Sequence, residues 1–416
     1  MLHLLCVAPE ARGRKVGRVL IAAAVAEARR RGARALRLDV FDNNEPAIEL
    51  YRSCGFADLG VFDIRVGGGL THPSHLMELD LRLDEEADMR STDAQPQRAS
   101  GDDARLLDPA ALSSCALCPR CCGVNRLAGE CGICGAAGTL RLARAALHFW
   151  EEPPISGTAG SGTVFFSGCP LKCVYCQNHE ISTGNFGIEV TPERLVEIML
   201  ELQDQGALNI NLVTATHYAH LLPTALEHAR RRGLTIPIVY NTSGYERVEA
   251  VRELGDLVDI WLTDFKYADA ALGQRLSHVV NYPAVARAAL AEMAAHIERR
   301  GGIATRVDGT WTRGIIVRHL VLPGHADDSC RVLDAIWETA GDIPISVMNQ
   351  YTPNATMRAA GGELARAVTE EEYERVLDHA DESGLHADVL AGGGAVDESF
   401  TPPFDTTGVL KRADAR

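Results

Sequence analysis

The chain has 416 residues, enough for two or three domains, and its 46% hydrophobic and 23% charged residues are typical of a soluble globular protein. A formal net charge of −15 argues against general binding to nucleic acid or anionic membranes, because the nonspecific electrostatic contribution would be repulsive. Without a secretory signal pattern or a run of eighteen apolar residues, the sequence predicts a cytoplasmic protein. Nine of the twelve cysteines fall between Cys115 and Cys176, which indicates metal chemistry.

The first 83 residues are predicted to form a small α/β unit. Strands are expected at Leu2–Val7 and Ala35–Phe41, with an Ala-rich helix between them that ends near Gly32. A second helix is expected at Pro46–Cys54, and two weaker strands complete the unit before Leu83.

Two motifs in this unit carry its expected chemistry. One is the turn Arg12-Gly13-Arg14-Lys15-Val16-Gly17, and the other runs from Asn44 through Tyr51 to Gly55-Phe56. Both resemble the acetyl-CoA-binding portion of GNAT-type N-acetyltransferases, in which backbone N–H groups at a helix start cradle the pyrophosphate. The resemblance implies that Asn44 contacts the cofactor and that Tyr51 protonates the departing CoA thiolate, while Lys15 stands where the family has its first glycine.

The resemblance covers only the second half of that family's fold. The strands and helices that build most of the amine-substrate side have no counterpart, since Met1 falls within the fourth strand of the family pattern. Half a sheet leaves an unpaired edge and an open substrate side, so we expect a non-catalytic remnant or a truncated sequence. An active, acetyl-CoA-dependent enzyme is the alternative.

Composition divides the rest of the chain. Residues 84–112 are dominated by Asp, Glu, Ser, Gln, Arg and Ala without periodicity, and they are expected to form a tether between folding units. A Cys-rich segment is predicted at 113–150, a core domain at 151–400 and a C-terminal tail at 401–416.

The Cys-rich segment is predicted to bind a metal. Of six cysteines within about twenty residues, four are spaced to wrap one ion or cluster: Cys115, Cys118, Cys122 and Cys134. Four soft thiolates select zinc or an iron–sulfur cluster over oxygen-loving metals, and the spacing leaves the choice between these two open. Reduced, metal-free cysteines in a loop are the alternative, which is disfavoured because so many thiols would invite oxidation.

The stretch Gly162–Cys176 is the strongest motif of the sequence. A short apolar strand leads through Ser-Gly into Cys169, Cys173 and Cys176, at Cys-x₃-Cys-x₂-Cys spacing. Three thiolates on one tight loop can hold three irons of a [4Fe–4S] cluster and leave the fourth iron without a protein ligand. Disulfides do not suit a cytosolic chain, and structural zinc takes four ligands, so these alternatives fit less well.

This loop, with Tyr175 just before its last cysteine, resembles the defining loop of the radical S-adenosylmethionine (SAM) superfamily. The wording Cys-x-x-Cys-Pro-Arg-x-Cys-Gly-Val-Asn-Arg narrows the resemblance to pyruvate formate-lyase-activating-enzyme-like members, from about Cys115 to Thr352. The resemblance implies that SAM binds the open iron, and that one-electron reduction cleaves it to a 5′-deoxyadenosyl radical, which abstracts a hydrogen atom.

Six buried-type strands alternate with helical patterns in the core domain. The strands are expected at Thr163–Ser167, Asn209–Ala215, Ile236–Asn241, Val258–Phe265, Ile315–Leu322 and Ile343–Asn349. The helices are expected at Thr191–Gly206, Ala219–Arg232, Tyr245–Leu254, Pro283–Arg300 and Asp327–Ala340, with a last one starting at the capping box Thr369-x-x-Glu372. This alternation favours an α/β fold with a parallel sheet covered by helices. By resemblance it is the partial (β/α)₆ barrel of radical SAM cores, and a doubly wound sheet is the alternative.

Polar residues follow the strands at their C-terminal ends, where a barrel gathers its active site. After the second strand, the glycyl-radical activases carry a Gly-Gly-Glu segment that binds the methionyl amine of SAM. This chain has Thr214, Thr216 and His217 there, which are candidates to replace that contact.

The next three strands also end in motifs similar to those of the activases. Asn241-Thr242-Ser243-Gly244 resembles a segment that touches the ribose and a monovalent cation, with Asn241 in place of an aspartate. Asp264-Phe265-Lys266 resembles an Asp-x-Lys motif, which implies that Lys266 lies near the cofactor carboxylate. Arg318 is expected to point inward beside apolar neighbours, where a buried charge needs an anion such as that carboxylate. For each residue, a structural polar network is the alternative interpretation.

The sequence therefore predicts a radical SAM enzyme of the glycyl-radical-activase-like group. Its predicted catalytic residues are Cys169, Cys173, Cys176, Lys266 and Arg318. A flavodoxin or ferredoxin is the expected electron donor, and the radical acceptor is a glycine of a partner protein or a small molecule. The alternatives are an N-acetyltransferase through residues 1–83, and a regulatory protein that keeps the cluster but cleaves no cofactor.

Overall fold

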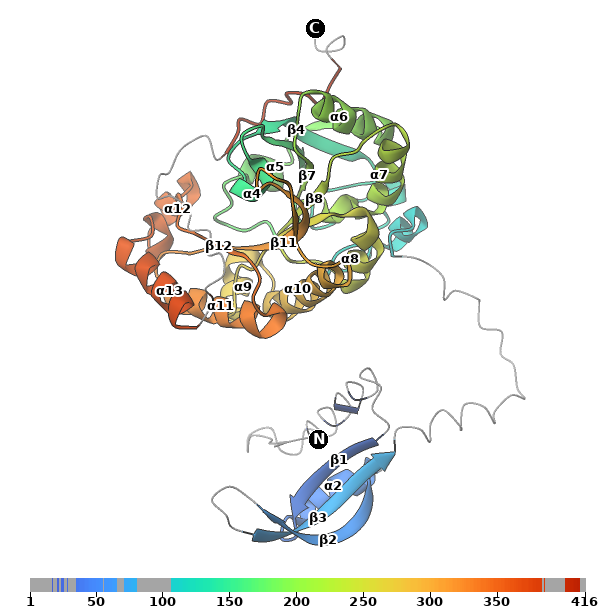
Figure 1. Cartoon of the computed structure of the whole chain (residues 1–416), viewed down its shortest axis with the longest axis vertical. Helices are drawn as coiled ribbons and strands as arrows, with labels where there is room; N and C mark the ends of the chain where they lie inside the picture. The colour runs from blue at the N-terminus through green and yellow to red at the C-terminus, as the bar shows by residue number, and fades with distance from the viewer. Residues whose placement is uncertain are drawn as a thin grey trace, which may run out of the picture. The chain divides into compact units, whose positions relative to one another are not determined.

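The computed structural model describes residues 35–54, 56–65, 71–80, 106–383, 385 and 401–411, together with single positions between 17 and 28. The chain divides into two compact units, Met1–Ser100 and Gly101–Arg416, and each is described by itself (Figure 1). The predicted strand Leu2–Val7 and most of the turn that begins at Arg12 lie outside the described residues.

The first unit is a three-stranded antiparallel sheet with a helix packed against it. Its elements are β1 (Ala35–Phe41), α2 (Glu45–Ser53), β2 (Ala57–Arg65) and β3 (Thr71–Asp80), and β3 lies between the other two strands. Leu36 and Leu38 alternate along β1 and meet Ile48 and Tyr51 of α2 in a shared core. The strand, helix and two further strands expected here are confirmed.

A nine-stranded sheet organises the second unit. Six of its strands are parallel and neighbour one another in the order β5 (Ser161–Phe166), β7 (Ile210–Val213), β8 (Ile238–Thr242), β9 (Ile260–Asp264), β11 (Trp311–Leu320) and β12 (Ile345–Met348). These are the six strands expected from the sequence, and the α/β class with a parallel sheet is confirmed. Sequential parallel strands bring all their C-terminal ends to one rim.

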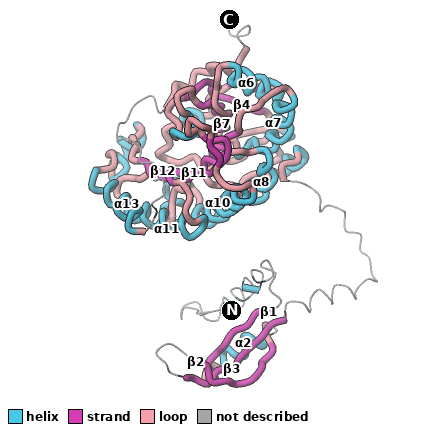
Figure 2. The backbone as a smooth tube through the Cα atoms, in the orientation of Figure 1, coloured by secondary structure: helices cyan, strands magenta, loops and turns pink. Residues whose placement is uncertain are grey.

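Helices cover the outside of this sheet (Figures 1 and 2). The expected ones are α6 (Pro192–Asp204), α7 (Leu222–Arg231), α8 (Val248–Leu254), α10 (Tyr282–Arg299), α11 (Ala326–Ala340) and α13 (Glu370–Glu382). Thr191 caps α6 by accepting the backbone N–H of Arg194, and the capping box of Thr369 and Glu372 starts α13 as expected. Shorter helices occupy the connections: α4 (Pro153–Ser156), α5 (His179–Ser182), α9 (Ala270–Ser277) and α12 (Ala355–Ala360).

Alternation along the strands decides what faces the interior. On β8, Ile238 and Tyr240 pack in the main core with the helices, whereas Val239 belongs to a separate apolar cluster. That cluster comprises Ile155, Val239, Ile260, Leu262, Trp311 and Ile316. The strand positions that continue its face toward the C-terminal rim are polar, including Asn241, Asp264 and Arg318. One end of the interior is therefore filled by hydrocarbon and the other is available to ligands.

Three strands were not expected. β4 (Leu140–His148) pairs antiparallel with β5, β6 (Ile188–Val190) extends that edge, and β10 (Ala304–Thr305) pairs with β11. Since β4 lies within residues 113–150, the Cys-rich segment is continuous with the barrel sheet and is not a separate folding unit.

The structure also moves two predicted boundaries. Residues 106–112, expected in the tether, belong to the second unit: Leu107 and Leu112 are buried, and Glu253 accepts the backbone N–H groups of residues 106 and 107. Residues 401–411, expected as a tail, pack back on β4, with Val409 fully buried. In both cases, a few apolar side chains within a polar stretch are enough to fix it to the core.

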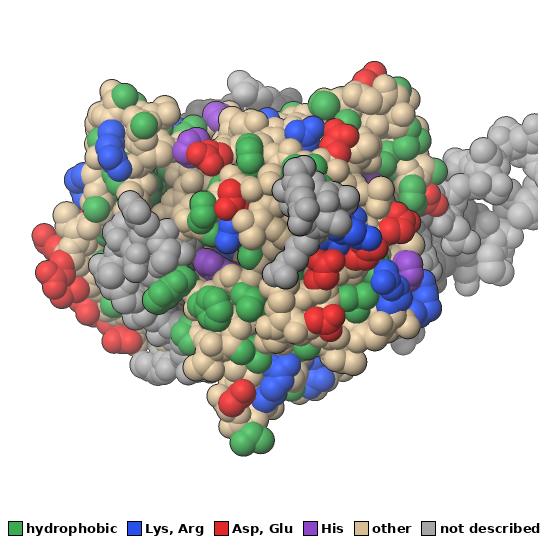
Figure 3. Space-filling view, turned by 90° about the horizontal axis from the view of Figure 1, so that it is seen from above, with side chains coloured by type: hydrophobic (Ala, Val, Ile, Leu, Met, Phe, Trp, Pro, Cys, Tyr) green, Lys and Arg blue, Asp and Glu red, His purple; other side chains and the backbone are tan. Residues whose placement is uncertain are grey.

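Among the described residues, no helix is long and apolar enough to cross a membrane. On the face in Figure 3, acidic and basic side chains are interspersed among hydrophobic ones.

Candidate active site

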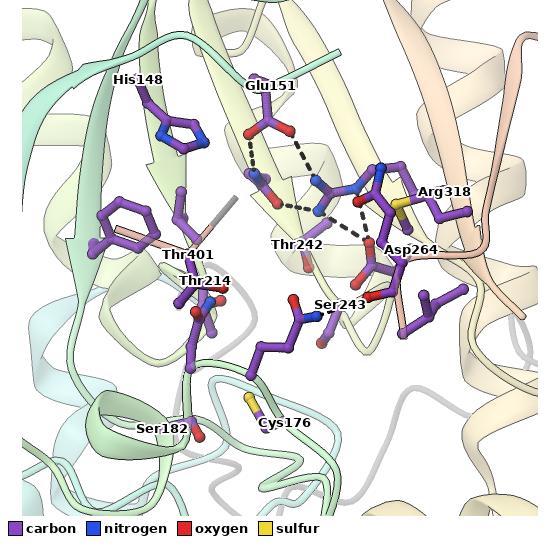
Figure 4. A pocket seen from close by; sticks show the side chains of 18 of the residues that line it. His148, Glu151, Cys176, Ser182, Thr214, Thr242, Ser243, Asp264, Arg318 and Thr401 are labelled. Carbon is purple, nitrogen blue, oxygen red and sulfur yellow. Dashed lines mark hydrogen bonds and ion pairs between the residues drawn. The ribbon is translucent and has the colours of Figure 1, made fainter. Parts of the chain in front are cut away.

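A cavity of about 1090 Å³ opens at the C-terminal rim of the parallel strands. Of the predicted site residues, it is lined by Cys169, Cys173, Tyr175, Cys176, Thr214, Asn241, Thr242, Ser243, Asp264, Lys266 and Arg318. Figure 4 shows Cys176 and Ser182 at one end and Glu151 at the other, near Arg318 and Asp264. The two ends are called the cluster end and the charged end below.

The loop that carries the three cysteines depends on a glycine. Gly168 has φ +89°, and a Cβ atom there would lie 2.5 Å from the carbonyl oxygen of Cys134. The adjacent N–H of Cys169 donates to that same carbonyl at 3.1 Å. Only glycine permits this close approach, which fixes the start of the loop against the Cys-rich segment.

The three cysteines of the loop are half-buried, and they influence one another electrostatically. Burial raises the pKa of Cys169 to about 12, and Cys173 raises it further. Burial, and again Cys173, also raise the pKa of Cys176. The Ser277 hydroxyl donates to the Cys173 sulfur at 2.9 Å and lies 2.7 Å from the Tyr267 hydroxyl, which donates to Tyr175 at 2.8 Å. Tyr175 is thus tied to the loop through a row of hydroxyl groups.

The charged end is a network in which basic and acidic groups balance. Lys266 Nζ lies 2.6 Å from Asp264, and Arg318 contacts Asp264 at 3.0 Å. Arg318 also contacts Glu151 at 2.9 Å and donates to Asn241 Oδ1 at 2.7 Å. Although burial alone would lower it, the carboxylate of Asp264 raises the pKa of Lys266. The anion expected beside Arg318 is therefore supplied by the protein itself, through Asp264 and Glu151.

Glu151 and Glu152 were missed by the sequence reasoning. Glu151 accepts amide hydrogen bonds from Asn211 and Asn241 in addition to its contact with Arg318. Burial raises the pKa of Glu152 to about 7, although the nearby Arg318 acts in the opposite direction. Two adjacent acidic residues before Pro153 could have suggested a functional position. Their place in the site depends, however, on β4 running antiparallel to β5, and the sequence did not predict that strand.

The ends of β8 and β9 are held together by a second glycine and a tyrosine. Gly244 has φ +74°, and a Cβ atom there would lie 2.2 Å from the Asp264 carbonyl oxygen. The Tyr282 hydroxyl donates to the Ser243 carbonyl at 2.8 Å and accepts the N–H of Lys266 at 2.9 Å. Ser243, which lines the cavity, has a buried hydroxyl oxygen without a hydrogen-bond partner among the described residues.

Thr214 stands apart because it adopts a left-handed conformation, with φ +60°, directly after β7. Such strain at a strand end is maintained only when surrounding contacts impose it, and here the Thr214 N–H donates to the Asn241 carbonyl at 2.8 Å. Thr214 lines the cavity, as Figure 4 shows.

Two predicted cofactor contacts are placed elsewhere. Thr216 and His217 are not among the cavity-lining residues. The Thr216 hydroxyl donates to Glu246 at 2.5 Å, and His217 Nε2 lies 2.8 Å from the Ser167 carbonyl. The chain turns into a 3₁₀ helix at Thr216–Leu221 directly after β7, which buries both side chains behind the cavity wall. They support the site from behind.

The four predicted ligands of the Cys-rich segment lie outside the cavity lining. Burial raises the pKa of the Cys134 thiol, with Arg126 lowering it and Cys115 and Cys122 raising it, so these groups are neighbours. Cys118 is electrostatically coupled to Cys134 and Cys115 in the same way. Cys121 and Cys131 are exposed.

In the first unit, the structure describes only some of the predicted acetyl-CoA contacts. Tyr51 is buried beside Phe56, with ring centroids 5.7 Å apart, and burial followed by Cys54 raises the pKa of its hydroxyl. Asn44 precedes α2 but makes no side-chain cap to it. Lys15 lies outside the described residues.

The residues around the cavity fit a cluster together with a nucleoside-bearing ligand. Three thiols from one loop line the cavity and no fourth cysteine does, so a bound [4Fe–4S] cluster would keep one iron accessible. The unpartnered Ser243 hydroxyl marks a polar position that a ligand would satisfy.

Comparisons with known families agree with this geometry. Residues 163–300 match the Radical SAM superfamily, and residues 1–56 match the Acetyltransferase (GNAT) family.

Two curated relatives cover different parts of the chain. An uncharacterized protein of Methanocaldococcus jannaschii, MJ0674, is 31% identical over 282 residues, which are 66% of this chain and 76% of that protein. Streptothricin acetyltransferase of Streptomyces lavendulae is 40% identical over 75 residues, which are 18% of this chain and 40% of that enzyme. The chain thus spans less than half the length of this acetyltransferase.

Among solved structures, a domain of pyruvate-formate lyase-activating enzyme from Bacteroides vulgatus is similar at 14% identity and a TM-score of 0.28. That match covers 42% of this chain and 92% of that domain.

The cysteine loop at the rim of a parallel α/β sheet, together with the two family matches, makes this chain a radical SAM superfamily protein that also carries an N-terminal GNAT segment. It belongs to the same family as the Methanocaldococcus jannaschii protein MJ0674.

Proposed function

We propose that this protein reductively cleaves SAM at a [4Fe–4S] cluster held by Cys169, Cys173 and Cys176, in the manner of glycyl-radical-enzyme activating enzymes. When bound, the cluster and SAM supply a 5′-deoxyadenosyl radical that abstracts a hydrogen atom from the acceptor. The single observation that carries this proposal is the set of three cavity-lining thiols from one loop, with no fourth cysteine in the lining.

The residues that line the cavity would hold the cluster and SAM, orient them, and shield them from solvent. The Cys173 sulfur accepts a hydrogen bond from Ser277, which would stabilise negative charge on a cluster held there. Among the described residues, Ser243 offers an unpartnered hydroxyl group at the cavity, whereas the Thr242 hydroxyl already donates to Glu246. Lys266 supplies a cation that interacts electrostatically with Cys173 at the cluster end. Because Asp264 and Glu151 already balance Arg318 and Lys266, an anionic ligand group would share these cations with the network.

The remaining roles are proposals of the same kind. A flavodoxin or ferredoxin would supply the electron, and the acceptor would be a glycine of a partner protein or a small molecule.

The direct test is anaerobic reconstitution of the full chain with iron and sulfide, followed by dithionite and SAM, with 5′-deoxyadenosine as the readout. We expect turnover by the wild type and by Cys131→Ser, whose thiol is exposed and remote from the cavity lining. Cys173→Ala should abolish it. A cluster-replete wild type that forms no 5′-deoxyadenosine would reject the proposal in favour of a regulatory role.

Acetyl transfer through residues 1–83 is a second candidate activity. It is favoured by the 40% identity to streptothricin acetyltransferase over 75 residues and by Tyr51 in α2, where the resemblance implies the proton donor. Acetyl-CoA turnover that survives Cys173→Ala and is lost in Tyr51→Phe would establish it. Wild-type protein that does not bind acetyl-CoA would exclude it.

A further inference from the structure

The Cys-rich segment is not accounted for by the site described above. It lies between the two matched regions, residues 1–56 and 163–300, and none of its cysteines lines the cavity. The structure divides its six cysteines by exposure. Cys121 and Cys131 are exposed, whereas the other four are buried or half-buried: Cys115, Cys118, Cys122 and Cys134.

Tight backbone turns lie around the four cysteines that are buried or half-buried, which are called the inner four cysteines below. Cys115 exchanges backbone hydrogen bonds with the chain eight to nine residues later, donating to the Val124 carbonyl and accepting from Gly123 at 3.0 Å each. A Cβ atom at Gly132 would lie 2.9 Å from the Cys122 sulfur and 3.7 Å from the Cys134 sulfur. A glycine at this point therefore lets the two sulfurs approach from either side.

A buried cation stands among these thiols without a carboxylate. Arg126 is 1% exposed and donates to the carbonyl groups of Ala137 and His217 at 2.6 Å. Its Nη1 lies 4.0 Å from the Cys115 sulfur, and its other hydrogen bonds within the described part of the chain go to backbone carbonyl groups, not to a carboxylate. A buried guanidinium needs a compensating negative charge, and thiolates bound to a metal centre would provide it.

The arrangement of the sulfurs bears on the kind of centre. Across the described part of the chain, no three His, Cys, Asp or Glu side chains converge as they would around a single metal ion. This holds for the inner four cysteines and equally for Cys169, Cys173 and Cys176. An iron–sulfur cluster takes one thiolate per iron corner, so its ligands stand further apart than those of one tetrahedral ion.

The segment also lies directly beside the cluster loop. The Cys134 carbonyl accepts the N–H of Cys169 at 3.1 Å, and Gly168 leaves room for that carbonyl. A centre held by Cys134 would be next to the loop that holds Cys169.

We propose that Cys115, Cys118, Cys122 and Cys134 bind a second iron–sulfur cluster with four protein thiolates, and that Arg126 is its buried counter-charge. This cluster is distinct from the one at Cys169–Cys176 and does not depend on SAM cleavage.

The test removes the three ligands of the first cluster and measures which metal the remaining cysteines still bind. The full chain with Cys169, Cys173 and Cys176 all changed to Ala is reconstituted anaerobically with ferrous iron and sulfide, desalted, and analysed for iron, acid-labile sulfide and zinc. We expect iron and sulfide in equal amounts, with visible absorption that bleaches on reduction. Adding Cys118→Ser should remove both, whereas adding the matched Cys131→Ser should leave them unchanged.

A triple variant that retains only zinc, or no metal, would overturn the proposal, as would equal losses in Cys118→Ser and Cys131→Ser. If the triple variant does not fold, the iron content of the wild type decides. It should exceed the roughly four irons of one cubane cluster and fall to about four in Cys118→Ser. A wild type holding only about four irons would reject the second cluster, while its 5′-deoxyadenosine assay would separately report on the first.

Discussion

The two ends of the cavity differ in how they deal with charge. At the charged end, Arg318 and Lys266 are matched by Asp264 and Glu151, all within 3.1 Å of a partner. At the cluster end, three half-buried thiols come from one loop, and the hydroxyl of Ser277 donates to one of them, Cys173. The charged end has its charges paired without a ligand, whereas the thiols of the cluster end are neutral and would become thiolates only when a metal displaces their protons.

The two ends of the cavity should therefore respond differently to mutation. Changes at the charged end should appear first in stability, because a balanced buried network is disturbed. Changes at the cluster end should appear in iron content and redox properties. Gly168→Ala and Ser277→Ala change the cluster end, Asp264→Asn changes the charged end, and Glu246→Gln changes a buried carboxyl group outside the cavity lining.

Gly168→Ala should have the largest effect, because its Cβ would collide with the Cys134 carbonyl at 2.5 Å. We expect destabilisation by about 4 kcal/mol and loss of most iron from the cysteine loop. Gly129→Ala is the matched control, since it has a similar φ of +85° with nothing within 4 Å, and it should cost only about 1 kcal/mol. Thermal unfolding and iron analysis measure both, and equal effects in the two variants would argue against the close contact.

Asp264→Asn tests the charged end. Removing this carboxylate leaves Lys266 and Arg318 with one partner fewer. Because these side chains are only 17–20% exposed, we expect the free energy of unfolding to fall by about 3 kcal/mol. Asp405→Asn is the control: it breaks the ion pair between Arg144 and Asp405, whose side chain is 51% exposed. It should lower the free energy of unfolding by less than about 1 kcal/mol. Denaturant unfolding compares them. An Asp264→Asn protein as stable as the wild type would show that the network is not structural.

Glu246 should make stability depend on pH. Burial raises its pKa from 4.5 to about 7, against hydrogen bonds from Thr216 and Thr242 that lower it. The folded state therefore retains a proton that the unfolded state has released between these values, and stability should fall as the pH rises from about 4.5 to 7, by at most about 3 kcal/mol. Melting temperatures of the metal-free chain from pH 5 to 8 measure this slope. Glu246→Gln should flatten it, and an unchanged slope in that variant would contradict the assignment.

Ser277→Ala should have the smallest effect. Its hydroxyl donates to the Cys173 sulfur, and such bonds favour the reduced, more negative cluster. Removing it should lower the reduction potential by tens of millivolts, on the order of 1 kcal/mol, while iron content stays the same. A redox titration followed by electron paramagnetic resonance measures the shift. Ser113→Ala, whose hydroxyl bonds only to the Ala110 carbonyl, is the control. A potential that does not move, or that rises, would contradict the hydrogen bond.

The three cavity-lining cysteines of the cluster end could be predicted from the sequence because they lie within eight consecutive residues, Cys169–Cys176. Ser277 and Tyr267, which come from a distant part of the chain, could not. The six parallel strands were also predictable, since each is a near-continuous apolar run between helical patterns. By contrast, the charged end is assembled from four strands and the β4–α4 connection, so only those members that follow a strand could be found. Glu151 was missed because antiparallel β4 was not foreseen.

Thr216 and His217 were predicted to contact the cofactor, but the structure places them outside the cavity lining. They follow β7 as closely as Thr214 does, but the 3₁₀ turn at Thr216–Leu221 directs them behind the cavity wall. Sequence position alone does not distinguish a side chain at the rim from one beneath it. Similarly, Leu107, Leu112 and Val409 were too few among polar residues to reveal that their segments pack on the core.

The central claim is that three protein thiolates hold a cluster whose fourth iron is open to SAM. Electron paramagnetic resonance of the reduced Cys118→Ser protein, in which the first cluster alone is expected, tests this directly when recorded before and after SAM is added. A bound ligand on an open iron should change the g-values, and should broaden the signal when the SAM carboxylate carries ¹⁷O. A spectrum that is identical with and without SAM would contradict the account.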